Sequence, residues 1–117
     1  HTDSCAMHVV NVPNMGAIGE LVQDSVIETN CLVKSSGAYP IASGKLPEVI
    51  KPLIMAVKTY ERLTIEAAVT GSKDKALQAL ICHPLVRGAD KAAAILEDIL
   101  EAHREYLGIF FEEGVTN

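Results

Sequence analysis

Basic residues are few in this 117-residue sequence: 10 Lys and Arg stand against 15 Asp and Glu, a formal net charge of −5. Without a basic excess, no positive patch can dominate the surface, which argues against nucleic acid or an anionic membrane as a partner. Long apolar runs are also missing, since no stretch approaches the roughly 20 residues of a transmembrane helix. The remaining composition, 49% hydrophobic and 21% charged, is that of one ordinary globular domain.

Cysteine is scarce as well. Cys5, Cys31 and Cys82 are widely spaced, form no C-x-x-C and are odd in number, so they make no disulfide framework. Cysteines of this kind are usually small buried hydrophobes in a reducing compartment. We therefore predict a cytoplasmic protein.

The first third of the chain has the pattern of strands and loops. His8–Val12 is a β-branched run that ends at Pro13, and Val26–Val33 is a second strand. Asn14–Asp24 separates them and is too long for a tight hairpin, so we expect a functional loop there. Ser35–Pro40 is predicted to be a loop.

The rest of the chain has helical periodicity. Pro52 follows Pro47 so closely that the first helix either kinks at Pro52 or begins there. The apolar stripe of the third helix includes His103, which we expect to be half-buried. The first helix is predicted to begin at Pro47 or Pro52 and to end at Gly71. The second is predicted to be capped by Ser72 and to end before Pro84. The third is predicted to be capped by Asp90 and to end at Gly108.

Together these elements predict an α+β fold, in which short strands with a long loop are followed by three amphipathic helices. Two short strands do not make a self-sufficient sheet, so further sequence is expected to cover the edges and the second face. The first residue is His1 rather than Met. We therefore expect 1–117 to be a piece of a longer polypeptide, with exposed apolar area or self-association.

Charged and histidine residues give no strong candidate for catalysis. The four histidines lack metal-ligand spacing, and His83, at a helix end beside Pro84, is expected to be structural, as a partly charged imidazole facing the helix dipole. Glu61 and Glu66 are too far apart around a helix to act as a pair. The other carboxylates are expected to be solvated, and Glu101 and Glu105 to form a mildly repulsive i,i+4 pair.

One segment remains as a candidate ligand site, Asn11–Ile18. Asn11 and Asn14 bracket a rigid proline, and Gly16 follows where backbone can approach a ligand. Amide side chains donate and accept together, which suits sugar hydroxyls. The alternative is a turn in which the amides satisfy their own backbone. The spacing leaves both open.

Four separated blocks of the sequence are informative together. In order, they are Val9–Ile18, Tyr60–Gly71, Ala76–Leu80 and His83–Val86. They resemble the C-terminal region of glycoside hydrolase family 4, and within it the 6-phospho-β-glucosidase branch. The resemblance runs from about His8 to about Phe110, with departures at Val22 and Gly108, where the family usually has Pro.

The resemblance implies a fold like the C-terminal domain of lactate and malate dehydrogenase-type enzymes. It implies a full-length enzyme that uses NAD and a divalent metal, typically Mn²⁺, and acts by redox-assisted elimination. In family members the cofactor fold, the metal-binding Cys and His and the tyrosine base lie upstream of this region. The resemblance therefore assigns no catalytic, cofactor or metal residue here, and Asn11, Asn14 and Gly16 are the expected substrate-side contacts.

We accordingly predict the C-terminal substrate-side and oligomerisation domain of a family 4 6-phospho-β-glucosidase, inactive alone. Its expected partners are its own N-terminal NAD-binding domain, a 6-phosphorylated β-glucoside and further copies of itself. The alternatives are an α-glycosidase or a galacturonidase of the same family, or a stand-alone α+β interaction module.

Overall fold

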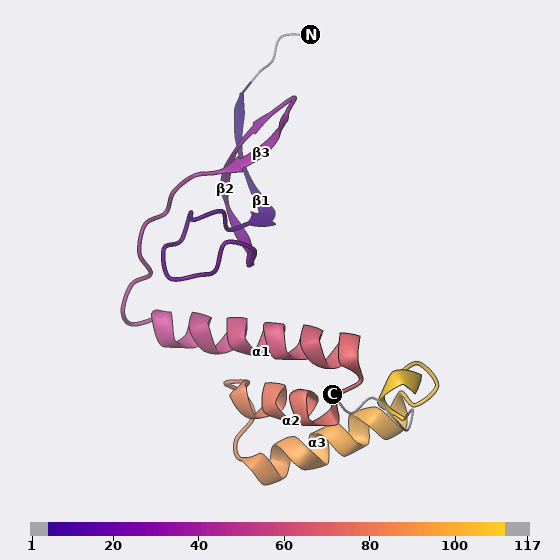
Figure 1. The fold of residues 1–117 in the computed structure, drawn as a ribbon. Helices are drawn as coiled ribbons and strands as arrows, with labels where there is room; N and C mark the ends of the chain where they lie inside the picture. The colour runs from indigo at the N-terminus through magenta and orange to yellow at the C-terminus, as the bar shows by residue number, and fades with distance from the viewer. Residues whose placement is uncertain (1–4, 112–117) are drawn as a thin grey trace. The chain divides into compact units, whose positions relative to one another are not determined.

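The computed structural model describes residues 5–111 and divides the chain into two compact units, His1–Lys51 and Pro52–Asn117. We call them the strand unit and the helical unit (Figure 1). Each has its own buried residues. In the strand unit they are Val12, Asn14, Ala17, Leu21, Ile27 and Cys31, and in the helical unit Ala67, Ala79, Ala92 and Leu100. The predicted α+β class is confirmed.

The strand unit is an antiparallel sheet in the order β1-β2-β3. β1 (Ala6–Pro13) and β2 (Val26–Lys34) are the two predicted strands, and β1 does end at Pro13. β3 (Gly37–Pro40) pairs with the second half of β2, with Cys31 opposite Pro40. The prediction of a loop over Ser35–Pro40 is therefore wrong for its last four residues. A tight turn after Lys34 returns the chain to β2, and the sheet gains a third strand.

The two faces of the sheet differ sharply in burial. Val12, Ile27 and Cys31 lie on one face and are at most 8% exposed. The strand register places the alternate residues on the opposite face, which we call the open face. Its large apolar side chains are 36–66% exposed; they are Met7, Val9, Val26, Leu32 and Tyr39. The sheet thus has one packed face and one largely uncovered face.

The helical unit contains three α-helices and a short 3₁₀ helix: α1 (Lys51–Thr70), α2 (Lys73–Cys82), α3 (Ala89–Ala102) and η1 (Gly108–Phe110). Pro52 lies in the first turn of α1, where its missing N–H costs nothing, so the helix begins there and does not kink. Pro47 instead accepts hydrogen bonds from the backbone N–H groups of Ile50 and Lys51 in the preceding turn.

The helix boundaries at Gly71 and Ser72 agree with the prediction. Gly71 has φ +68°, and its N–H donates to the Ala67 carbonyl at 2.8 Å, which ends α1 in the left-handed conformation. A Cβ atom at this position would collide with the Ile109 carbonyl oxygen. The Ser72 hydroxyl then accepts from the Lys75 N–H at 3.2 Å and caps α2.

The boundaries of α3 differ from the prediction at both ends. Gly88, not Asp90, is the N-cap residue, and Asp90 lies in the first turn, where its charge favours the helix dipole. The helix ends at Ala102, and His103 is its exposed C-cap residue rather than a half-buried one. Ending there lets the chain turn so that Leu107 and Phe110 reach the interior.

Small side chains dominate the interior of this unit. Ala67, Ala79 and Ala92 are the buried residues of α1, α2 and α3 together with Leu100. They leave an apolar pocket of about 290 Å³ that is open to the surface and is lined by all three helices and by Leu107 and Phe110. The helical unit is therefore held by close helix approach.

Candidate functional site: the loop between β1 and β2

The loop between β1 and β2, residues 14–25, is organised around one buried polar residue. Asn14 is fully buried (0% exposed). Its Nδ2 atom donates to three carbonyl oxygens, those of Ile18 at 3.0 Å, Leu21 at 2.9 Å and Val22 at 3.3 Å. Its Oδ1 atom accepts from the Ile18 N–H at 2.8 Å. One side chain thus fixes the path of eight residues.

The tip of this loop is exposed and conformationally strained. Met15 has φ +48° and Gly16 φ +84°, and the Ala17 N–H donates to the Asn14 carbonyl at 2.8 Å, which closes a turn around them. Positive φ is unusual for a methionine, and such outliers cluster at functional sites. Met15 is 64% exposed, and nothing lies near Gly16. The loop therefore presents a tight, pre-shaped tip to its surroundings.

The base of the loop is fastened to the segment that follows β3. The Ser43 N–H donates to the Ala17 carbonyl at 2.8 Å, and the Gly19 N–H donates to the Gly44 carbonyl at 3.2 Å. Glu20 accepts from the Leu46 N–H at 3.2 Å and lies 3.6 Å from the Lys51 ammonium. The Leu46 hydrogen bond, assisted by Lys51, lowers the pKa of the Glu20 carboxyl below its ordinary value.

The three predicted substrate-side residues have three different positions. For the Asn14 side chain the structure agrees with the alternative of a turn, because both its amide nitrogen and its amide oxygen are hydrogen-bonded to the loop backbone. Asn11 is exposed on the open face of the sheet, opposite Glu28. Gly16 is exposed at the loop tip. Contact of these residues with a substrate stays a prediction.

Met15 and Glu20 were missed by the sequence reasoning. The signal for Met15 was present, because Asn-Met-Gly is a turn sequence. The structure gives positive φ to Met15 as well as to Gly16. Glu20 had no local signal, because its partners Leu46 and Lys51 are distant in sequence.

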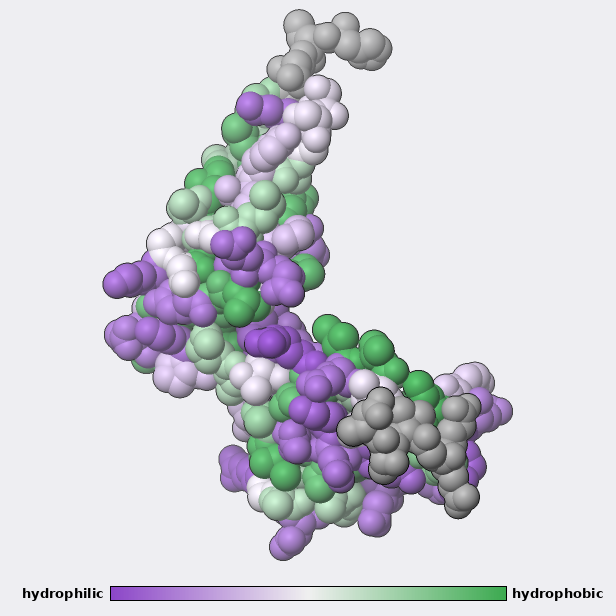
Figure 2. Space-filling model, in the orientation of Figure 1, coloured by the Kyte–Doolittle hydropathy of each residue, from purple (hydrophilic) through white to green (hydrophobic). Residues whose placement is uncertain are grey.

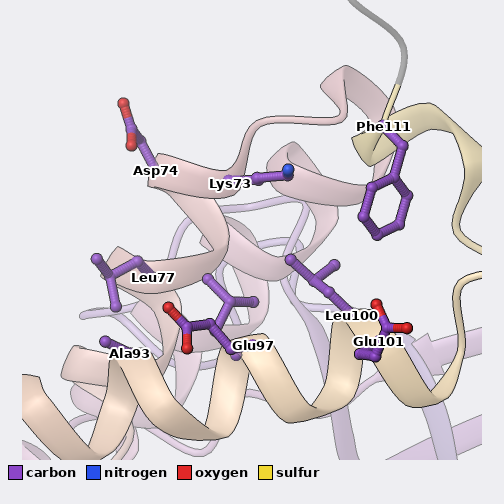
Figure 3. Close-up of a pocket in the computed structure, with 9 residues that line it drawn as sticks. Lys73, Asp74, Leu77, Ala93, Glu97, Leu100, Glu101 and Phe111 are labelled. Atoms are coloured by element: carbon purple, nitrogen blue, oxygen red, sulfur yellow. The ribbon is translucent and has the colours of Figure 1, made fainter.

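The helical unit has a second concavity, a cavity of about 460 Å³ between α2 and α3 (Figure 3). Lys73 and Asp74 from the start of α2 and Glu97 and Glu101 from α3 surround an apolar floor, and Phe111 closes one end. The cavity and the apolar pocket described above contain none of the predicted site residues.

Glu101, one of the charged residues around this cavity, has a structural partner. Glu101 binds Arg104 at 2.9 Å, and the guanidinium of Arg104 stacks 4.1 Å from the centre of the Phe111 ring. The expected repulsive pair of Glu101 and Glu105 is not formed as an i,i+4 pair, because α3 ends at Ala102, before Glu105. Glu112 and Glu113, also expected to be solvated, lie outside the described residues.

The remaining candidates have structural roles. Glu61 binds Lys58 at 2.6 Å, and Glu66 binds Lys75 at 3.2 Å. The His83 ring lies edge-on to Tyr60, and its Nδ1 atom accepts from the Leu85 N–H at 3.2 Å. These two contacts give His83 the structural role that was expected, at the turn that follows α2.

Within residues 5–111, no three His, Cys, Asp or Glu side chains gather in a metal-binding arrangement. The sequence has no G-x-G-x-x-G segment that could cradle a pyrophosphate. Among the same residues, no helix is long and apolar enough to cross a membrane.

Comparison with known proteins identifies the family. Residues 1–86 match the model of the family 4 glycosyl hydrolase C-terminal domain. The chain is 45% identical over 106 residues to the 6-phospho-β-glucosidase of Thermotoga maritima and 41% identical over 113 residues to a probable 6-phospho-β-glucosidase of Bacillus subtilis. These matches cover 91% and 97% of this chain but 26% of each relative, so the chain spans about a quarter of their length.

Solved structures give the same result for the fold. The Thermotoga maritima enzyme with manganese, NAD⁺ and glucose-6-phosphate superimposes with a TM-score of 0.81 at 46% identity, covering 90% of this chain and 26% of that one. A 6-phospho-α-glucosidase from gut microorganisms, in complex with NAD and glucose-6-phosphate, gives 0.84 at 33% identity, covering 90% and 24%. The chain therefore belongs to glycoside hydrolase family 4, and its residues 1–86 match the C-terminal domain of that family.

Proposed function

We propose that this chain is the C-terminal part of an NAD- and Mn²⁺-dependent 6-phospho-β-glucosidase, where it supplies substrate-side surface and subunit contacts. The observation that carries the proposal is the 45% identity to the Thermotoga enzyme over nine-tenths of the chain. Identity to 6-phospho-α-glucosidases and maltose-6′-phosphate glucosidases is 33–38%. The fold alone does not separate the two, because the TM-scores are 0.81 and 0.84.

The 6-phospho-α-glucosidases are accordingly the second candidate, and an α-galacturonidase at 33% identity is a more distant one. Enzymes of different specificity can share this fold, because specificity depends on the residues of the site and not on the scaffold. The identity margin favours the β-glucoside.

The cofactors of such an enzyme would be held by its other part. NAD would supply the hydride acceptor and Mn²⁺ the charge that polarises the sugar. The described residues fit neither group, so none is assigned to them, and the chain is expected to be inactive alone. Partners at this level are an N-terminal NAD-binding domain of the same polypeptide, a 6-phosphorylated β-glucoside, and further copies of the enzyme.

Within this role, the tip at Met15 and Gly16 is the part of the chain best suited to approach the sugar. Asn14 is buried, and both its amide nitrogen and its amide oxygen are hydrogen-bonded to the loop backbone, which holds the tip rigid. A rigid tip would hold a bound sugar in a fixed position. Asn11 is a separate, exposed candidate. All three cysteines are free thiols, which supports a reducing, cytoplasmic location.

The experiment replaces the last quarter of the Thermotoga enzyme with this chain and measures cleavage of an aryl 6-phospho-β-glucoside with NAD and Mn²⁺. We expect the chimera to turn over and the 117-residue chain to be inactive. An active isolated chain would overturn the assignment of the catalytic groups to the other part. A chimera that cleaves only the α-glucoside would favour the second candidate.

A pair of variants in the same chimera tests the loop, at a temperature at which both are folded. Asn14→Ala is expected to lower kcat/KM about tenfold or more, because small displacements of positioned groups are costly. Glu97→Ala, an exposed carboxylate in the helical unit, is the control and is expected to change it less than about twofold. Equal, small effects would reduce Asn14 to a purely structural residue.

A further inference from the structure

The open face of the sheet is unusually apolar for a surface in contact with water. Met7, Leu32 and Tyr39 lie side by side in one row across the three strands, and they are 66%, 36% and 45% exposed. Val9 and Val26, on the same face, are 59% and 56% exposed. The row and Val9 form one apolar patch, and the pair of Asn11 and Glu28 separates Val26 from it. Apolar patches of this kind mark interaction surfaces in soluble proteins. Figure 2 shows apolar surface interspersed with polar surface over both units.

The charge on this face is equally informative. By the strand register its charged residues are Glu28, in the middle of β2, and Lys34, at the hairpin end. The uncharged part of the face is the row of Met7, Leu32 and Tyr39 with Val9 beside it, whereas Glu28 and Asn11 face each other farther along the β1–β2 pair. Charged residues are depleted at the core of protein interfaces, so this row fits a partner surface that is itself apolar.

The edge of the sheet shows the same property. β1 is an edge strand in the described part of the chain, is eight residues long and has no Lys, Arg, Asp or Glu. Exposed edge strands normally carry charges or are very short, because a long apolar edge pairs with other strands. β1 instead has protection only from Pro13 at its end. An uncovered face and an unprotected edge meet on the same strand.

We infer that the open face and the β1 edge are the surface on which the preceding part of the full-length polypeptide packs. The inference rests on the proposed function, in which this chain is one part of a longer enzyme. The relatives are about four times as long as this chain, so most of their residues are available as the covering part.

The test measures the reactivity of single cysteines introduced on the open face, in the isolated chain and in the chimera with the Thermotoga enzyme. The variants are Val9→Cys and Leu32→Cys, with Lys45→Cys, exposed in the segment after β3, as the control. Maleimide labelling is followed for each peptide by mass spectrometry. We expect both face cysteines to react about tenfold or more slowly in the chimera than in the isolated chain, with the control unchanged.

Two outcomes would overturn the inference. Face cysteines that stay reactive in an active chimera would mean that the face is solvated, and the proposed function would still stand. Face cysteines already protected in the isolated chain, with sedimentation that depends on concentration, would mean that a second copy covers the face. A chimera that is inactive although its face is protected would contradict the proposed function and leave this inference intact.

A second variant keeps the test decisive if the cysteine chimeras fold poorly. Val9→Lys is expected to leave the thermal midpoint of the isolated chain unchanged, because Val9 is 59% exposed there. In the chimera it is expected to cause loss of soluble enzyme by about tenfold, because a charge would be buried at the interface. Leu85→Lys, 84% exposed in the helical unit, is the matched control. Equal behaviour of the two variants in the chimera would overturn the inference.

Discussion

Different kinds of interaction stabilise the interior of each of the two units. The strand unit depends on directional hydrogen bonds, with Asn14 bound to three carbonyls and one amide inside a loop of twelve residues. The helical unit depends on small side chains, alanines that allow three helices to approach while a pocket of about 290 Å³ remains. A loop that must keep one shape uses a polar buried residue, whereas a scaffold does not need one.

This difference predicts different sensitivity to mutation. A buried amide with four partners cannot be replaced without leaving polar groups unsatisfied, and each such group costs about 1–3 kcal/mol. Apolar side chains in a helix interior tolerate exchanges that conserve their volume better. The following substitutions test that contrast, from the largest expected effect to the smallest.

The largest effect is expected for Asn14→Ala. The change strands the carbonyls of Ile18 and Leu21 and an amide N–H inside the loop, so the free energy of unfolding should fall by about 3 kcal/mol. Urea denaturation measures the loss. Asn11→Ala, the same exchange at an exposed position, should cost less than about 0.5 kcal/mol.

Hydrogen exchange would then show where the damage lies. The loop and the segment around Ser43 and Gly44 should lose protection in Asn14→Ala, while α2 and α3 keep theirs. Uniform loss of protection over both units would contradict the idea that Asn14 serves the strand unit alone.

Gly71→Ala should have the next largest effect, and it lies in the helical unit. The residue has φ +68°, and an added Cβ would meet the Ile109 carbonyl oxygen, so the free energy of unfolding should fall by about 2 kcal/mol. Gly108→Ala is the control, because nothing lies near its Cβ position. Thermal melts of the two variants compare them, and equal midpoints would show that the close approach of Ile109 is not required.

Ser72→Ala should cost about 1 kcal/mol, because the Lys75 N–H loses its capping acceptor. Ser72→Gly removes the same hydroxyl but suits the cap backbone, and it should cost only a few tenths of a kcal/mol relative to wild type. Chemical denaturation of both variants tests the cap. Equal losses of stability in the two variants would contradict the idea that glycine suits the backbone conformation at the cap position.

The smallest effect is expected for Glu20→Gln and depends on pH. Because the pKa of Glu20 is lowered in the folded chain, the stabilisation from its ionised form is complete above its unfolded pKa of about 4.3 and is lost as the pH falls through the folded value. The difference between wild type and Glu20→Gln should therefore be present at neutral pH and shrink below about pH 4. Thermal melts across pH measure it, with exposed Glu105→Gln as the control. A difference independent of pH would assign the role to packing.

Much of the fold could be predicted from local patterns. Residue chemistry within a few positions accounts for the end of β1 at Pro13 and the start of β2 at Val26. It also accounts for the positive φ of Gly71 and for the Ser72 cap. The errors have non-local causes. β3 exists because β2 accepts it as a partner, and α3 stops at Ala102 because Leu107 and Phe110 reach the helical core.

The candidate site shows the same division. A pattern of amides and glycine indicated that the segment from Asn11 to Ile18 matters, but it could not say which side chain turns inward. Local propensity does not contain that information, because Asn14 is buried through carbonyls up to eight residues away and Asn11 is exposed through its place in the strand register.

By itself the sequence determined the α+β class, the three helices, the family and the region of the chain that carries the candidate loop, because periodicity, capping residues and separated blocks are local properties. Only the tertiary structure decided that Asn14 builds the loop, that Met15 and Gly16 form its tip, and that one face of the sheet is left open. Burial and strand pairing join residues distant in sequence, and no local pattern specifies which of them will meet.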